Sequence, residues 1–163
     1  MNETVAFAAA AADKAARYAE LVPQLRALVD GEPDLVANLA NAAAALKECI
    51  AAASWVGFYV MRGGELVLGP FQGKVACVRI ALGRGVCGTA AAERRTLVVP
   101  DVDLFPGHIA CDAGSKSEIV VPIVVGDRVV AVLDVDSHDR AAFDDEDARG
   151  LTQVCDVIAS LSW

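Results

Sequence analysis

The chain has 163 residues, a length that fits one domain able to bury a core without a disulfide or a metal. Its hydrophobic fraction of 55% excludes a disordered chain, and charges break the apolar runs before the ~18 residues that a membrane-spanning helix needs. The formal net charge is −8, and no cluster of lysines or arginines stands out. Nucleic acid is therefore not an expected partner, because binding phosphates requires concentrated positive charge.

The cysteines and the start of the chain bear on the compartment. Five cysteines, an odd number, do not fit a secreted disulfide framework. The apolar start resembles a signal peptide, but Glu3 precedes it and no lysine or arginine does. We interpret residues 1–14 as the start of a helix, with Asn2 or Thr4 as its cap. We therefore expect a cytoplasmic protein whose thiols stay reduced unless they do redox work.

The first third of the chain predicts helices. The Ala-rich residues 5–22 are expected to form a helix that ends before Pro23, and residues 24–30 a second short piece. Gly31 closes that piece. A third helix is expected over residues 34–51, where apolar side chains recur at helical spacing.

The middle of the chain predicts strands. Residues 54–61 and 65–69 flank a Gly-Gly pair and indicate a hairpin. Further strands are expected over residues 75–81, 96–99, 119–125 and 129–135, with a short helix at 87–93 and a loop over 101–117.

A last helix closes the chain. Asp144 predicts its first turn, because Asp147 follows three residues later as in a capping box, and the helix runs to about Leu161. The order of elements predicts one α+β domain. We expect an antiparallel sheet of about six strands with the N- and C-terminal helices packed on one face.

The cysteines differ in what their positions indicate. Cys77 lies in a predicted strand, where packing is the ordinary role of a thiol. Cys87 begins a short helix, and a helix N-terminus lowers a thiol pKa, so local physics makes Cys87 the leading nucleophile. Cys111 lies in the long loop, where a thiol can attack a substrate and then reach a partner. Cys49 and Cys155 lie in helices and are expected to be buried hydrophobes.

A metal site is the alternative use of these thiols. His108 lies near Cys111, so a set of three cysteines and one histidine is conceivable. The spacing lacks the close Cys-x-x-Cys pair of zinc sites. We therefore predict no metal.

Two carboxylates mark the end of a strand. Asp134 and Asp136 share one face of that strand with Val130 and Val132, because side chains alternate with a period of two. Aspartate is depleted in strands, so the pair indicates a site, although a strand that leaves the core for solvent would show the same pattern. Glu118 precedes the partner strand.

The register of these two strands tests whether the acids share a site. A regular two-residue turn would pair Glu118 with Val135 and put it on the wrong face. One extra residue, in the loop or in a bulge, sets Glu118 opposite Asp136 and Val120 opposite Asp134. A shared site therefore predicts an odd loop or a bulge.

Seven segments together resemble a known family. They are SWVGFY at 54–59, LGPFQGKVAC at 68–77, GRGVCGTA at 83–90, VPDV at 99–102, FPGHIACD at 105–112, SEIVVP at 117–122 and LDVDS at 133–137. In this order they are similar to the free methionine-(R)-sulfoxide reductases, small stand-alone GAF-domain enzymes, over about residues 15–160. The resemblance implies a single GAF domain over residues 1–163.

The resemblance implies a reaction and its thiols. A thiolate reduces the R epimer of free methionine sulfoxide and becomes a sulfenic acid. A second thiol converts the sulfenic acid to a disulfide, and thioredoxin, supplied by NADPH, reduces that disulfide without any bound cofactor. The family pattern implies Cys111 as the nucleophile, Cys77 as the resolving thiol and Cys87 as an auxiliary thiol. The family pattern and the helix N-terminus therefore point to different nucleophiles. We choose Cys111, as the family pattern implies, rather than Cys87.

The resemblance also implies the binding residues. Trp55 would form the pocket wall with Tyr59 nearby, and Glu118, Asp134 and Asp136 would bind the substrate and protonate its oxygen. A carboxylic acid can donate at neutral pH only if its pKa is raised, and like-charged neighbours raise it. The remaining acids can pair with the substrate's ammonium group, which a methionine within a protein lacks.

Two other functions compete with the reductase. A GAF domain can bind a small molecule such as a cyclic nucleotide, but a sensor needs an output domain and has no need of three cysteines. A thiol switch without substrate is disfavoured because acids near a thiol raise its pKa. The Ala-rich helices have faces that could pack on a second copy, so we expect a homodimer.

Overall fold

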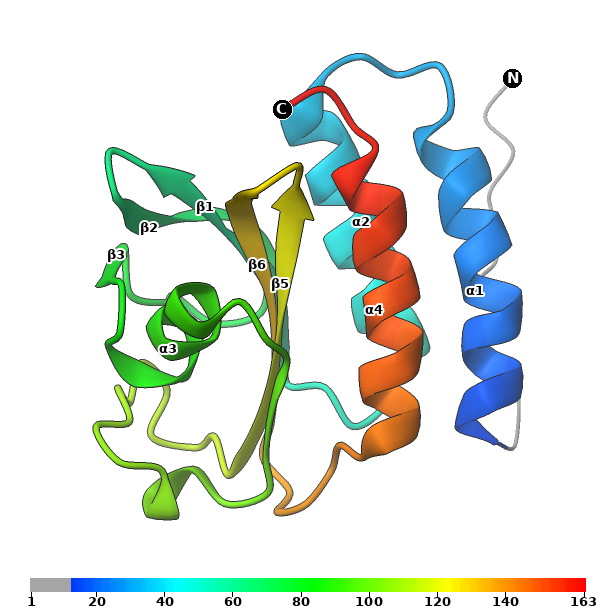
Figure 1. Cartoon of the computed structure of the whole chain (residues 1–163). Helices are drawn as coiled ribbons and strands as arrows, with labels where there is room; N and C mark the ends of the chain where they lie inside the picture. The colour runs from blue at the N-terminus through cyan, green and yellow to red at the C-terminus, as the bar shows by residue number, and fades with distance from the viewer. Residues whose placement is uncertain (1–12) are drawn as a thin grey trace.

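Figure 1 shows a computed structural model of the chain, which describes residues 13–163. The strands are β1 (Trp55–Arg62), β2 (Glu65–Gln72), β3 (Arg79–Ala81), β4 (Leu97–Val99), β5 (Ser117–Val125) and β6 (Arg128–Ser137). They form one antiparallel sheet in the order β3-β2-β1-β6-β5-β4. The helices are α1 (Lys14–Val29), α2 (Leu35–Cys49), α3 (Gly85–Glu93) and α4 (Asp145–Ala159), with a short 3-10 turn, η1 (Val102–Leu104). The predicted α+β class is confirmed.

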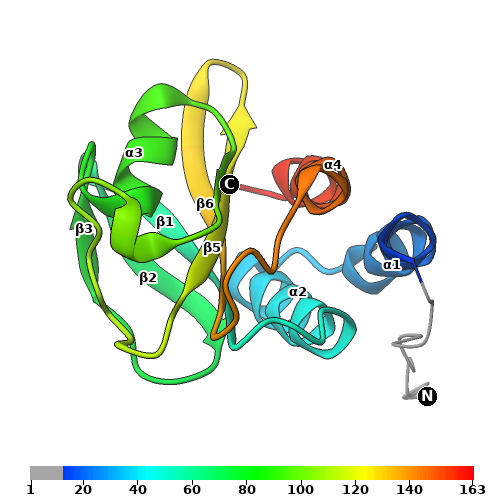
Figure 2. The same ribbon diagram turned by 90° about the horizontal axis from the view of Figure 1, so that it is seen from below.

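The helices divide between the two faces of the sheet. α2 and α4 pack on one face, α1 lies outside them, and α3 covers the opposite face (Figure 2). Side chains such as Leu46, Phe58, Leu133 and Val154 fill the core between the sheet and the helical layer. A second, smaller core lies between the sheet and α3. Within residues 13–163 no helix is both long and apolar enough to cross a membrane.

The first helix departs from the sequence prediction. α1 continues through Pro23, where we expected it to end. A proline inside a helix removes one backbone hydrogen bond and costs about 3 kcal/mol. Leu21 and Leu25, on either side of Pro23, are fully buried, and their burial offsets that cost. In the described part of the chain Asp13 caps α1, and the predicted caps Asn2 and Thr4 lie outside the described residues.

The start of α4 confirms the predicted capping box. Asp144 accepts a hydrogen bond from the backbone of Asp147, whose carboxylate accepts one from the backbone of Asp144. The buried Asp147 also accepts from the Tyr18 hydroxyl at 2.8 Å and pairs with Lys14. These contacts attach α1 to α4.

The segment that carries Cys77 is a loop rather than the predicted strand. Only its end, Arg79–Ala81, pairs with β2 as β3. Trp55 donates to the carbonyl of Lys74 and Tyr59 to that of Cys77, each at 3.0 Å. Side chains from β1 therefore satisfy two backbone carbonyl groups of this loop.

The β5–β6 hairpin contains the predicted irregularity. Val125 pairs with Arg128 across a two-residue turn, whereas further from the turn Ile123 pairs with Ala131. The pairing shifts by one residue in between, so Val130 is the extra residue of a β-bulge.

The bulge sets the predicted register of the acids. Beyond it Glu118 lies opposite Asp136 and Val120 opposite Asp134. One expectation is wrong: Val130 packs against the helical layer, whereas Asp134 faces the α3 side. The bulge causes this difference, because an inserted residue reverses the alternation of side chains along the strand.

Candidate active site

A pocket opens on the α3 side of the sheet, between β1, β5, β6, the start of α3 and the loop that follows η1. Seven of the eight predicted site residues line it: Trp55, Tyr59, Cys87, Cys111, Glu118, Asp134 and Asp136. Cys77 is not among the lining residues, but it is bonded to one that is. The fold therefore brings together residues that are up to 81 positions apart in sequence (Trp55 to Asp136).

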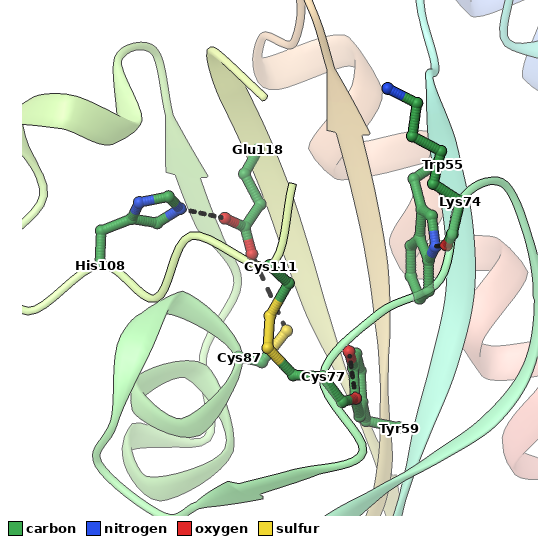
Figure 3. Close-up of a disulfide and its surroundings, with 8 residues drawn as sticks. All are labelled: Trp55, Tyr59, Lys74, Cys77, Cys87, His108, Cys111 and Glu118. Atoms are coloured by element: carbon green, nitrogen blue, oxygen red, sulfur yellow. Dashed lines mark hydrogen bonds and ion pairs between the residues drawn. A yellow bond between two sulfur atoms is a disulfide. The ribbon is translucent and has the colours of Figure 1, made fainter. Parts of the chain in front are cut away.

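Cys77 and Cys111 are joined by a disulfide (Figure 3). They are 34 positions apart in the sequence, and their Cα atoms are 5.5 Å apart. Cys111 is exposed and Cys77 is half-buried, so the bond lies at the edge of the pocket. A reductant in solution can reach it.

Cys87 has the opposite character. It is 4% exposed, and its thiol lies 3.8 Å from Oε1 of Glu118, to which it donates. Burial first, then the charges of Asp134 and Glu118, raise the pKa of this thiol well above its ordinary value. The expectation that the helix N-terminus lowers this pKa is wrong, because desolvation outweighs a helix-dipole contribution of about 1 kcal/mol.

The three carboxyl groups lie together in the pocket, where Glu118 and Asp134 are buried and Asp136 is half-buried. Burial is the main cause that raises the pKa values of Glu118 and Asp136 well above normal, and the charge of Asp134 raises both further. Burial also raises the pKa of Asp134 to about 6. No lysine or arginine of residues 13–163 forms an ion pair with these acids. The raised pKa values of Glu118 and Asp136 favour their protonated forms, which can donate a proton.

One buried carboxylate oxygen has no hydrogen-bond partner among residues 13–163. Oδ1 of Asp134 is buried and accepts no hydrogen bond from the described residues. A buried acceptor without a donor is costly, so such atoms are uncommon in folded proteins. A donor group on a bound molecule would satisfy this oxygen.

Aromatic rings form the wall of the pocket on β1. The ring centroids of Trp55 and Tyr59 are 6.0 Å apart, and Trp55 stacks on Phe71 at 5.2 Å. Gly57 makes this stack possible, because a Cβ atom there would lie 2.5 Å from Cη2 of Trp55. Trp55 and Tyr59 also hold the Cys77 loop, because their polar atoms donate hydrogen bonds to its carbonyl groups.

His108 belongs to the pocket, although the sequence pointed to it only as a metal ligand. Its Nε2 atom lies 3.7 Å from Oε2 of Glu118, and its side chain is 15% exposed (Figure 3). Burial lowers its pKa, which favours the neutral ring. The sequence signal is its position three residues before Cys111 in the same loop.

The predicted alternative of a site with three cysteines and one histidine is not assembled, because Cys77 and Cys111 are bonded to each other. Among residues 13–163, one group could instead offer metal ligands within 4.8 Å of one another: Cys87, Glu118 and Asp134. A thiol binds a metal as a thiolate, and burial disfavours that form of Cys87. These groups are better suited to holding protons.

Comparison with known proteins identifies the family. Residues 29–161 match a GAF domain model. The chain is 52% identical to the free methionine-R-sulfoxide reductase of Escherichia coli (strain K12), covering 84% of this chain and 83% of that protein. It is 46% identical to the free methionine-R-sulfoxide reductase of Saccharomyces cerevisiae, covering 85% and 82%. The chain belongs to the free methionine-R-sulfoxide reductase family.

A solved structure supports the same conclusion. The free methionine-R-sulfoxide reductase of Neisseria meningitidis, in complex with its substrate, superposes with a TM-score of 0.89 at 51% identity, covering 92% of this chain and 90% of that chain. The family and the GAF fold expected from the seven sequence segments are confirmed. This member of the family is an oxidoreductase.

Proposed function

We propose that the protein reduces free L-methionine (R)-sulfoxide to L-methionine, with Cys111 as the attacking thiol. One observation carries the proposal: an exposed thiol within bonding distance of a second thiol lines the same pocket as Glu118, a buried carboxyl group whose pKa is raised. Reducing a sulfoxide requires both a sulfur nucleophile and an acid that protonates the departing oxygen.

The first step transfers oxygen between two sulfur atoms. The Cys111 thiolate attacks the sulfoxide sulfur while Glu118 gives a proton to the sulfoxide oxygen. Methionine leaves, and the oxygen stays on Cys111 as a sulfenic acid. The methionine sulfur is reduced by two electrons and the Cys111 sulfur is oxidised by two.

The second step restores the thiols. The Cys77 thiol attacks the sulfenic acid, water leaves, and the disulfide forms. We further propose that thioredoxin, recharged by NADPH, reduces this disulfide, so that the chain needs no bound cofactor. Val75 and Val78, beside Cys77, are 88% and 63% exposed and offer an apolar surface to a protein reductant. Such a reductant fits the cytoplasm, which is the compartment we propose.

The acids also account for a preference for the free amino acid. The ammonium group of methionine sulfoxide can donate to the unpartnered oxygen of Asp134 and to Asp136. Trp55 offers an aromatic wall to the methyl end of the substrate. A methionine within a protein has no ammonium group, and leaving these buried acceptors unpaired would be costly.

Turnover of each epimer tests the proposal. Purified protein is incubated with racemic free methionine sulfoxide and dithiothreitol, and both epimers are followed by chiral chromatography. We expect loss of the R epimer only, no loss with Cys111→Ser, and full activity with Cys49→Ala, which changes a buried helical thiol far from the pocket. Consumption of neither epimer would contradict the proposal and favour a small-molecule binding module.

A further inference from the structure

Glu118 cannot take its proton easily from solvent while the pocket is occupied. It is 6% exposed and lines the pocket that the substrate would fill. If Glu118 gives a proton to the sulfoxide oxygen, another proton must reach it. The route should come from a side of Glu118 that the substrate does not cover.

The two oxygen atoms of Glu118 have different neighbours. Oε1 accepts from the thiol of Cys87, which is itself buried and lines the pocket that the substrate would fill. Oε2 faces Nε2 of His108 at 3.7 Å. This separation is too long for a hydrogen bond, and a small movement of the loop or one bridging water would complete the contact.

His108 connects the interior with the surface. Its ring is 15% exposed, about twice the 7% of the Glu118 side chain. It lies on the loop between η1 and β5, so it approaches Glu118 from outside the sheet (Figure 3). A neutral imidazole can accept a proton on one nitrogen and release one from the other.

We propose that His108 is a proton relay for Glu118, an inference that rests on the proposed reductase function. As Glu118 protonates the sulfoxide oxygen, a proton passes from Nε2 of His108 to Glu118, and Nδ1 takes one from water. His108 acts on the reaction through Glu118, so it is a positioning residue.

The proton count of the cycle balances with this route. Glu118 loses one proton to the sulfoxide oxygen, and that proton leaves in water together with the proton of the Cys77 thiol. Cys111 releases one proton to solvent when it becomes a thiolate. The relay returns one proton from solvent to Glu118, so the two steps need no further acid, and a dithiol reductant then reopens the Cys77–Cys111 disulfide.

Within residues 13–163, few other ionisable groups act on His108. Glu118 faces it from β5, and the charge of Asp103 on η1 raises its pKa, while burial lowers the pKa by more. Cys87 and Asp134 lie on the far side of Glu118, in contact with that carboxyl group. The neutral ring, which a relay needs, is thus favoured by the surroundings of His108.

Rescue by imidazole tests the relay. We measure kcat/KM for free methionine (R)-sulfoxide with dithiothreitol between pH 6 and 9. We expect His108→Ala and His108→Gln to lose about tenfold at neutral pH, at the lower end of general acid–base effects, because Glu118 itself remains. Added imidazole should restore His108→Ala and should leave Glu118→Gln unchanged, because that variant lacks the proton acceptor. The matched control is His138→Ala, the chain's other histidine, which should respond to imidazole no more than the wild type does.

Three results would contradict the relay or the function on which it rests. Wild-type kcat/KM and pH profile in His108→Gln would overturn the relay, even if His108→Ala failed to fold. A folded His108→Ala that imidazole does not rescue would also overturn it and leave a packing role. A wild-type protein that consumes no substrate would overturn the proposed function, which is a different result from an active wild type with unaffected variants.

Discussion

Glu118 on β5 and Asp136 on β6 are directly opposite each other in an antiparallel pair. Two like charges at such a position destabilise a sheet. The arrangement is tolerable when at least one of the two carboxyl groups keeps its proton, and burial raises the pKa of both well above normal. The register of two strands thus sets up an acid that can donate at neutral pH.

Glu118→Gln should remove the proton donor while keeping the shape of the side chain. We expect kcat/KM to fall about 100-fold. In the wild type kcat/KM should decline as pH rises through the raised pKa of Glu118, because ionisation removes the proton, and the variant should lack that decline. Glu65→Gln, at an exposed ion pair with Arg79, is the control. A variant with an unchanged rate and pH profile would refute this role for Glu118.

Asp134→Asn should stabilise the folded protein and lower its reductase activity. The folded pKa is about 6 against an ordinary 3.8, so the folded state binds the proton more tightly than the unfolded state. Wild-type stability should therefore fall as pH rises from about 4 through about 6. At pH 7 the free energy of unfolding of the variant should exceed that of the wild type by up to about 3 kcal/mol. At pH 4 the two free energies of unfolding should be nearly equal.

Urea unfolding at the two pH values checks the effect of Asp134→Asn. The exposed Asp127→Asn removes the same charge from a turn and should show no such pH dependence. The rate of sulfoxide turnover should drop in Asp134→Asn and stay at the wild-type level in Asp127→Asn. If Asp134→Asn were destabilised equally at both pH values, the result would argue against a raised pKa for the buried Asp134 carboxyl group.

Gly57→Ala should disturb the aromatic wall. An added Cβ would overlap Phe71 and the ring of Trp55, and overpacking of this kind costs about 1–3 kcal/mol. We expect a lower melting temperature, a higher KM for the sulfoxide and altered Trp55 fluorescence. Measuring in a Trp163→Phe background isolates that signal, because the chain has two tryptophans. Unchanged fluorescence and KM would show that the wall tolerates the methyl group.

Thiol alkylation should follow exposure. In the oxidised protein we expect iodoacetamide to modify no cysteine of the folded chain, because the three free thiols are buried. After reduction Cys111 should react first, and Cys87 only on unfolding, since burial raises its pKa and blocks access. Peptide mass spectrometry gives the order. Early labelling of Cys87 would restore it as the candidate nucleophile.

The sequence was sufficient where local chemistry decides structure. The Asp144 capping box, the Gly63-Gly64 hairpin and the bulge that aligns Glu118 with Asp136 were all predictable. The capping box and the hairpin depend on a few neighbouring residues. The bulge followed from the period of a strand together with the hypothesis that the three acids share a site.

The remaining differences arise from contacts distant in sequence. Burial of leucines on both sides carries α1 through Pro23, which local propensity alone would not allow. The pKa of Cys87 depends on carboxyl groups from β5 and β6, so its helix position was misleading. The role proposed for His108 depends on its position beside Glu118, which only the fold shows. The expected homodimer stays a prediction.

A single-turnover measurement tests whether Cys111 is the attacking thiol. Fully reduced protein is mixed with excess free methionine (R)-sulfoxide without any reductant, and the methionine formed per chain is counted. We expect about one methionine for the wild type, about one for Cys77→Ser with a sulfenic acid trapped on Cys111, and none for Cys111→Ser. Methionine formed at wild-type yield by Cys111→Ser would contradict the assignment of Cys111 as the attacking thiol.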